Sequence, residues 1–548
     1  MRHTVVATVS VLVATLAALG AGVPASGSSS PTFTHRSAAS PTFTRPSRAD
    51  ARRISRGDPK HVNEPATWAA PGGARYVAYQ RGSQLSVTRD GGRTWRHLHG
   101  AEMLTRHIRS SSCTSQRDVG DVELAGDQRG RLYFADLQVT ANSGSGGADS
   151  GIQPVVAYSS SHQGFRRYHG VCAAHQPASV DREWMAAWRK PHRSSRHASV
   201  YLSYHDFSVN TIWVNASHDG GRHWGQPVNV INDPQASDAS ACDTIPAGTA
   251  VDPRNGWVYV AWTAGSNSLS NAATGCNYTQ GAVFNQFWVA VSKDGGRTWT
   301  DSLAFSGPDV TAAEPSDMSE IFGSLAVGRD GTVYVSFPAY LHHEYDGFVT
   351  WAPPAGPDGT LRFHRDPVKV NGPGTHTTYF TRLVAGDHGR VDVIYLGSRT
   401  RNVVSTPTNK ATYDGSDPTK PNCVPDAADP GGKGVRFLGK PCEMPASSTW
   451  GLFLAQSLHL TATRPGFTRT TLRRRVHTGD ICTLGIFCLG DDNRDIADVN
   501  DIKIDSSGGA QVAYTWESAK GTRTEIDFQC QRGGSGVYRH RRVRDCRG

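Results

Sequence analysis

A two-strand unit that recurs along most of the chain limits the possible folds more than any other feature. Its clearest copy, GTAVDPRNGWVYVAW at Gly248–Trp262, is a short apolar strand, an Asp- and Gly-containing turn, and a strand of alternating aromatic and β-branched residues. This pattern predicts a β-hairpin. Similar units begin at Ala66, Val122, Trp184, Leu325, Leu383 and Ile502.

A second hairpin follows each unit. The clearest copies are LSVTRDGGRTWRHL from Leu85, IWVNASHDGGRHW from Ile212 and FWVAVSKDGGRTW from Phe287. Two successive hairpins make a four-stranded antiparallel sheet, and such sheets arranged radially form a β-propeller with only short open edges. We therefore predict an all-β fold over residues 62–548, a β-propeller of four-stranded antiparallel blades. Seven blades fit the repeats best, and six or eight stay open as alternatives.

The first 61 residues lack this pattern. In residues 1–25, Arg2 and His3 precede an apolar stretch that ends at a small-residue cleavage site, Val23-Pro24-Ala25, as in a secretory signal peptide. Read instead as a membrane anchor, the stretch is a weak span because it is rich in Ala, Gly and Thr. Residues 26–61 are rich in Ser, Thr, Pro and Arg, which predicts a disordered leader. We expect a secreted, extracellular protein without a membrane span once the signal is removed.

The ten cysteines suit an oxidised, exported protein. The sequence has no CxxC pair and no Cys/His zinc pattern, so we predict disulfides and neither a metal nor a cofactor. Pairing within neighbouring loops gives Cys113–Cys172, Cys242–Cys276, Cys423–Cys442, Cys482–Cys488 and Cys530–Cys546. We expect the first four bridges to order loops on one face and the last to tether the tail.

Three of the second hairpins share the pattern Ser/Thr-x-Asp-Gly-Gly-Arg-x-Trp. The copies are Thr88, Asp90, Gly91, Gly92 and Trp95; Ser217, Asp219, Gly220, Gly221 and Trp224; and Ser292, Asp294, Gly295, Gly296 and Trp299. Asp and Ser/Thr side chains can accept hydrogen bonds from the amides of a tight turn, and glycine permits positive φ. The Trp can bury a large apolar surface. We predict that these turns stabilise the blades and take no part in chemistry.

This motif resembles the Asp-box, or bacterial neuraminidase repeat, of the sialidase superfamily, and the resemblance covers most of residues 62–545. It implies a propeller whose Asp-boxes lie away from the catalytic face. It also implies a tyrosine nucleophile assisted by a glutamate, an aspartate acid/base, and three arginines that grip the substrate carboxylate. The family's Phe/Tyr-Arg-Ile-Pro motif is missing: the corresponding stretch of this chain reads NEPATWAAP.

Charged residues precede the expected innermost strands, on the face opposite the Asp-boxes. They are Glu64, Asp118, Asp121, Glu123, Asp181, Arg182, Glu183, Asp243, Glu320, Arg382, Arg494, Asp495, Asp498 and Asp501. Each acid taken alone is more readily structural than catalytic, as a residue of a strand-end turn, a loop hydrogen bond or a cation site. Glu64, Asp121 and Glu183 are the acid/base candidates and Tyr379 is the candidate nucleophile. Arg182 and Arg382 are the candidates for binding an anionic substrate.

Three functions fit these features. The first is a glycan-directed hydrolase, an exo-alpha-sialidase or a relative acting on an anionic sugar. The second is an acidic-polysaccharide lyase with His205, His342 or His376 as proton carriers. The third is a non-catalytic propeller that binds a glycan or a protein. The formal charge of +9 favours an anionic glycan as partner, although solubility explains it equally well. No nucleic-acid-binding motif is present, and we expect a monomer.

Overall fold

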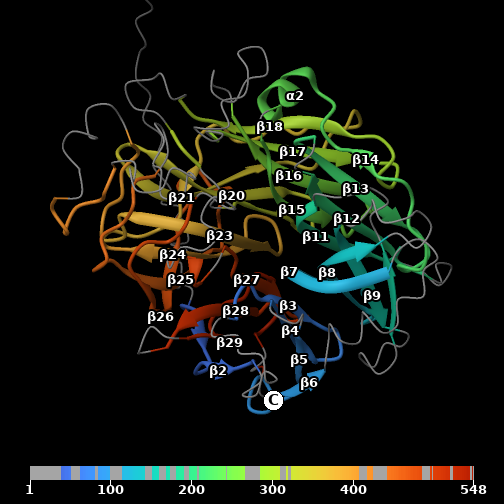
Figure 1. Cartoon of the computed structure of the whole chain (residues 1–548), viewed down its shortest axis with the longest axis horizontal. Helices are drawn as coiled ribbons and strands as arrows, with labels where there is room; N and C mark the ends of the chain where they lie inside the picture. Colours follow the sequence, from blue (N-terminus) through green and yellow to red (C-terminus); the bar gives the residue numbers. More distant parts are fainter. Residues whose placement is uncertain are drawn as a thin grey trace, which may run out of the picture. The chain divides into compact units, whose positions relative to one another are not determined.

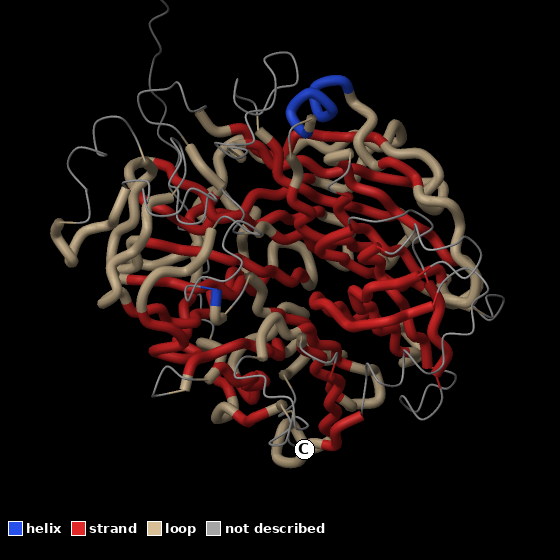
Figure 2. The backbone as a smooth tube through the Cα atoms, in the orientation of Figure 1, coloured by secondary structure: helices blue, strands red, loops and turns tan. Residues whose placement is uncertain are grey.

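A computed structural model describes most of the chain from residue 39 onward. The described ranges are 39–50, 62–80, 84–98, 114–141, 151–159, 168–172, 180–190, 197–206, 209–241, 243–265, 284–308, 316–318, 322–405, 416–423, 441–483, 494–496, 498–518, 523–543 and 546. Strands make up most of their regular structure, and one short helix, α2 (Pro234–Ser240), precedes β15 (Figure 2). Asp233 caps this helix by accepting from the amides of Gln235 and Ala236.

Four of the sheets have four antiparallel strands each. The first holds β3 (Ala66–Ala69), β4 (Arg75–Tyr79), β5 (Gln84–Thr88) and β6 (Arg96–Leu98). The second holds β7 (Thr114–Gly126), β8 (Leu132–Ala141), β9 (Gly151–Ser159) and β10 (Tyr168–Cys172). The third holds β11 (Val180–Trp188), β12 (Ser199–Asp206), β13 (Thr211–Ser217) and β14 (Val228–Asn229). The fourth holds β15 (Ile245–Val251), β16 (Val258–Ala264), β17 (Gln286–Ser292) and β18 (Thr300–Ser306).

An eight-stranded sheet contains two antiparallel runs. One run is β19 (Ser324–Val327), β20 (Val333–Leu341), β21 (Glu344–Ala352) and β22 (Val368–Lys369). The other is β23 (Thr377–Ala385), β24 (Val391–Ser398), β25 (Thr449–Ser457) and β26 (Thr468–Thr478). A single parallel pair, Tyr345 with Thr377, joins the two runs. The last sheet holds β27 (Asp501–Ile504), β28 (Ala510–Glu517) and β29 (Thr524–Gly533), with β1 (Thr42–Phe43) and β2 (Ser47–Arg48) paired to β29.

The first strands of these runs contact one another in a closed cycle, in the order β3, β7, β11, β15, β19, β23, β27 and back to β3. Figure 1 shows strands of this set near the centre and later strands of each run farther out. This is the predicted all-β propeller of four-stranded antiparallel blades. Because hydrogen bonding merges two runs into one sheet, the number of blades stays a prediction.

Packing between neighbouring sheets explains why the inner hairpins are more apolar than simple alternation requires. Every residue of β16, from Val258 to Ala264, is buried. Its two faces belong to different packing environments: Val258, Val260 and Trp262 join one apolar cluster, and Tyr259 and Ala261 join another. A sheet covered on both faces has no solvent side on which to place polar residues.

The three Ser/Thr-x-Asp-Gly-Gly turns have the predicted geometry. In the second, the Ser217 hydroxyl donates to Asp219 at 2.9 Å and accepts from the Gly221 amide at 2.9 Å. Gly220 and Gly221 both have positive φ, 81° and 85°. Trp224 and Trp299 are buried, as predicted. Trp95 is only half-buried, so the burial expected of the box tryptophans is incomplete there; its ring meets Phe528 of the last sheet edge-on.

The prediction of a disordered leader is wrong for residues 39–50. This segment forms β1 and β2 and adds to the outer edge of β29. Thr44 accepts hydrogen bonds from Gln529 and Cys530, and Arg48 pairs with Asp50 at 2.6 Å and Glu525 at 2.7 Å. Edge hydrogen bonds and ion pairs hold the segment, so its sequence shows no alternating apolar pattern.

Two predicted disulfides are present, Cys423–Cys442 and Cys530–Cys546. Cys482 is also disulfide-bonded. Its predicted partner, Cys488, lies outside the described residues, as do Cys113, Cys242 and Cys276, and the side chain of Cys172 is not described. Those three pairings therefore stay predictions.

Candidate active site

Backbone irregularities in the inner strands position several predicted site residues. The pairing of β11 with β12 shifts register between Asp181 and Trp184, and that of β23 with β24 shifts between Tyr379 and Arg382. Arg182, inside the first shift, has a φ of 37°. A β-bulge redirects side chains, and positive φ at a residue other than glycine costs energy that surrounding contacts must offset. These bulges mark the inner strands as a candidate site.

Glu64 and Asp121 are held together by one amide. The Gln80 side chain donates through Nε2 both to Oε2 of Glu64 and to Oδ1 of Asp121, the latter at 2.5 Å. The second oxygen of Glu64 accepts from the Asp498 amide at 3.1 Å. Glu64 itself precedes β3 with a φ of 46°. Two predicted acid/base candidates from different sheets thus form a carboxyl pair.

Arg182 lies against this pair. Its Nη1 atom is 3.6 Å from Glu64 Oε2 and 3.9 Å from Asp121 Oδ2, and its Nη2 atom is 4.0 Å from Glu123 Oε2. Arg182 is only 4% exposed. Within the described part of the chain, its Nε and Nη1 atoms have no hydrogen-bond partner. The guanidinium therefore balances the charge of the carboxylates while leaving hydrogen-bond donors unused.

Arg382 occupies the neighbouring half of the cluster. Its Nη2 atom is 3.2 Å from Asp501 Oδ1, and Lys503 Nζ is 3.4 Å from the same oxygen. Lys503 also lies 3.5 Å from Glu123 Oε1. The other Asp501 oxygen accepts from the Thr67 amide at 2.8 Å. Glu123, between Arg182 and Lys503, links the two halves into one network.

Trp184 supplies the surface on which both arginines rest. The guanidinium carbons of Arg182 and Arg382 each lie 4.0 Å from the centroid of its ring. The indole N–H donates to the Pro246 carbonyl at 2.9 Å, which fixes the orientation of the ring. Stacking of this kind favours arginine over lysine and stabilises a partly desolvated cation.

The pKa values of the paired carboxyls shift in opposite directions. Burial, followed by repulsion from Asp121 and Asp498, raises the pKa of Glu64 well above its usual value. Burial also acts to raise the pKa of Asp121, but Arg182 and the hydrogen bond with Glu64 outweigh it and lower that pKa. Within the pair, a proton therefore binds more readily to Glu64 than to Asp121.

Two further acids of β11, Asp181 and Glu183, have raised pKa values. Burial and the nearby Asp121 raise the pKa of Asp181 to about 7. Burial and Asp121 also raise the pKa of Glu183 well above its usual value. Glu183 is fully buried, and neither of its carboxyl oxygens has a hydrogen-bond partner among the described residues. The protonated form of Glu183 is therefore favoured, and an acid whose pKa is raised in this way can serve as a proton donor.

Tyr379 has the contacts of a core residue. Its side chain is fully buried, its ring stacks on Trp450, and it meets Tyr345 edge-on. Its hydroxyl oxygen accepts from Asn402 Nδ2 at 2.8 Å. These contacts place the ring in the packing between β21, β23 and β25, in contrast to the polar surroundings of Arg182.

The three histidines considered for a lyase differ in burial and in their partners. Burial lowers the pKa of His205 to about 3, so this ring is neutral, and its Nε2 atom lies 3.7 Å from Asp243. His376 pairs with Glu344 at 2.9 Å. His342 is exposed in the turn between β20 and β21. His205 is also paired with Asp181 across β11 and β12.

Several charged candidates lie at the margin of the cluster or beyond it. Arg494 pairs with Asp498 at 2.8 Å. The side chain of Asp118 and all of Glu320 lie outside the described residues. Sequence reasoning missed Gln80, Trp184 and Lys503 as parts of the site. Each sits near the end of a repeat strand, and no motif distinguishes it from an ordinary strand residue.

The fold and the inner-strand cluster together define a β-propeller with a buried acidic centre braced by stacked arginines. No family model and no curated protein matches the chain. Among solved structures, it is similar to a protein of unknown function from Dyadobacter fermentans, with 11% identity, coverage of 77% of this chain and 98% of that one, and a TM-score of 0.39. Likenesses of the size found here carry no argument about activity.

Two enzymes are among the similar structures. A variant of the NanB sialidase from Streptococcus pneumoniae is 11% identical, with coverage of 87% of this chain and 70% of that one and a TM-score of 0.37. An alpha-L-arabinanase from Penicillium chrysogenum, solved with arabinobiose, is 14% identical, with coverage of 65% and 94% and a TM-score of 0.37.

The described residues contain no cluster of three or more His, Cys, Asp or Glu side chains arranged to hold a metal ion. None of the described helices is long and apolar enough to cross a membrane.

Proposed function

We propose that the chain is a secreted, glycan-directed β-propeller that hydrolyses glycosidic bonds with Glu64 and Asp121 as its acid–base pair. The observation that carries this proposal is the Gln80 amide that holds both carboxyls beside Arg182 while their pKa values shift apart. Glycoside hydrolysis needs a carboxylic acid to protonate the leaving oxygen and a carboxylate to assist water or stabilise developing positive charge.

The glycan as substrate is supported by the three turns that resemble Asp-boxes, and an anionic sugar by Arg182. The unused Nε and Nη1 donors of Arg182 suit the carboxylate of such a sugar. Secretion is supported by the disulfides at Cys423–Cys442 and Cys530–Cys546. We also propose that the protein is a monomer.

Within this class, the contacts favour a carboxyl-based reaction over the tyrosine-based reaction of a true exo-alpha-sialidase. Tyr379 is packed on Trp450, and its oxygen is already hydrogen-bonded by Asn402. Arg382 is paired with Asp501. A sialidase-type reaction requires both side chains to be rearranged, whereas Glu64 and Asp121 already share the Gln80 amide.

The second candidate is a non-catalytic propeller that binds a glycan or a protein. The pairing of both arginines with carboxylates favours it, because buried ion pairs also brace inner strands without any chemistry. The two functions differ in one respect: only the hydrolase consumes its ligand.

A panel of fluorogenic sialosides, uronides and neutral pentosides, with binding measured for the corresponding acidic oligosaccharides, tests the proposal. We expect hydrolysis of at least one anionic glycoside by the wild type and at least a tenfold loss of binding in Arg182→Ala. Arg382→Ala should lose less, because Arg382 already has Asp501 as partner. Wild-type binding without hydrolysis supports the second candidate; neither binding nor hydrolysis rejects a glycan ligand.

A further inference from the structure

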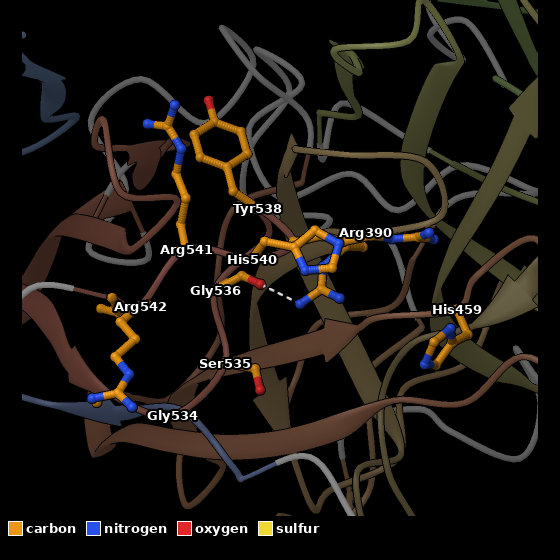
Figure 3. Close-up of a pocket in the computed structure, with 12 residues that line it drawn as sticks. Arg390, His459, Gly534, Ser535, Gly536, Tyr538, His540, Arg541 and Arg542 are labelled. Carbon is orange, nitrogen blue, oxygen red and sulfur yellow. Dashed lines mark hydrogen bonds between the residues drawn. The ribbon is translucent and has the colours of Figure 1, made fainter. Parts of the chain in front are cut away.

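A cavity of about 720 Å³ lies against the chain's basic C-terminal segment (Figure 3). Among the described residues, its lining includes four arginines and two histidines, Arg390, Arg539, Arg541, Arg542, His459 and His540, and no Asp or Glu. Figure 3 shows Arg390 and His459 on one side of the Gly534–Gly536 backbone and Arg541 and Arg542 on the other. We call this region the tail cavity.

The chain holds the tail cavity in a defined shape. The Arg390 guanidinium donates to the Gly536 carbonyl at 2.6 Å, and the Val537 amide donates to the Gly508 carbonyl at 2.9 Å. The Cys530–Cys546 disulfide ties the end of the segment to β29. A basic sequence run is usually a solvated tail, but this one is fastened to the turns of two sheets.

Asp387 contacts the tail segment from outside the cavity. Asp387 accepts from the Arg539 amide at 2.6 Å and from Arg329 at 3.1 Å, and it does not line the cavity. Burial and repulsion from Arg539 lower the pKa of Arg390. Several cations with no acid among the described lining residues create a local positive potential that an anionic ligand would relieve.

The tail cavity is distinct from the inner-strand cluster. Arg390 ends the tight turn between β23 and β24, whereas Arg382 lies within β23 and points its guanidinium over Trp184. The turn and the tail segment line the cavity; none of the predicted catalytic residues does. A ligand at this cavity therefore need not occupy the proposed reaction site.

We propose that the tail cavity is a second binding site, for the carboxylate or sulfate groups of an acidic polysaccharide. Guanidinium groups bind such planar or multidentate anions through paired N–H donors. The volume is that of a site for a short ligand segment. A nucleic-acid surface would instead be an extended basic stripe that follows a backbone. The site would retain the protein on a charged polymer.

Binding of dextran sulfate, polygalacturonate and uncharged dextran to the full-length mature protein tests this proposal. We expect at least one acidic polymer to bind, more weakly at high salt, and uncharged dextran not to bind. Arg541→Ala/Arg542→Ala should weaken binding at least tenfold. Arg474→Ala/Arg475→Ala, which removes two exposed arginines of β26, should change it less than twofold.

Arg541 also donates to the Ser506 carbonyl, so the double variant removes a structural hydrogen bond as well as two charges. A second variant therefore separates loss of binding from loss of folding. Arg542→Glu reverses one exposed charge and should weaken binding at least tenfold with an unchanged melting temperature. Any of three results would overturn the proposal. The Arg474/Arg475 control loses as much binding as the cavity variants, duplex DNA binds more tightly than either acidic polysaccharide, or the wild type binds neither acidic polymer. Glycosidase activity is not part of this readout.

Discussion

The Arg382 guanidinium carbon lies 4.0 Å from the centroid of the Trp184 ring, although the two residues belong to different sheets. Arg182, from the same strand as Trp184, lies at the same distance from that ring. Stacked side chains therefore connect β11 and β23, which are not neighbours in the cycle of first strands. Trp184 therefore contributes both to the packing of the propeller and to the positions of the two arginines in the candidate site.

Replacing Trp184 tests this contribution. Trp184→Ala should lower the free energy of unfolding by about 3–5 kcal/mol, the usual cost of truncating a buried aromatic side chain. Trp257→Ala, at a half-buried position, is the matched control and should cost less. Urea unfolding at constant pH measures both, and equal costs would contradict the role given to Trp184.

Asp392 should make stability depend on pH. Burial raises its pKa to about 7, although hydrogen bonding to Gln456 and the nearby Arg390 oppose the shift. Between pH 4 and pH 7 the folded state keeps a proton that the unfolded chain has released. The free energy of unfolding should therefore fall as pH rises through this range and level off above it.

Asp392→Asn should remove this part of the pH dependence, because the amide stays neutral and its oxygen can still accept from Gln456. Thermal unfolding between pH 4 and pH 8 measures the effect. Asp366→Asn, at an exposed position, should behave like the wild type. A pH profile of Asp392→Asn that parallels the wild type would show that Asp392 is charged in the folded protein.

The strand segment at residues 39–50 should contribute to the stability of the last sheet. A chain that starts at Ala39 should melt at the wild-type temperature. A chain that starts at Ala51 should melt lower, because it loses the hydrogen bonds of Thr44 and the ion pairs of Arg48. Equal melting temperatures of the two chains would show that β1 and β2 pair only weakly with β29.

The repeats predicted the fold because hairpin signals are local. The turn at Ser217–Gly221 forms from residues four apart, and its hydroxyl and glycines are visible in the sequence. The pairing of residues 39–50 with β29 joins the two ends of the described chain and depends on edge hydrogen bonds. No local apolar pattern encodes such a contact, so composition alone suggested disorder.

The candidate site was predictable only in outline. Acids near the inner strands identified Glu64 and Asp121, and Arg182 and Arg382 followed from their chemistry. The contacts that define the pair come from Gln80 and Trp184, which lie in ordinary strand sequence. Tyr379 could not be distinguished from a nucleophile by sequence, because its burial depends on Tyr345 and Trp450 from neighbouring strands.

The pH–rate profile of glycoside hydrolysis by the wild type, Glu64→Gln and Asp121→Asn tests the central claim most directly. The account predicts a bell-shaped profile for the wild type and a loss of at least about 100-fold in kcat for both variants, as expected when a general acid or base is removed. Glu525→Gln, a carboxyl change beside Arg48 at the outer edge of the last sheet, should retain the wild-type rate. If Glu64→Gln and Asp121→Asn fold and hydrolyse an anionic glycoside at the wild-type rate, the two residues are not the acid–base pair and the account is contradicted.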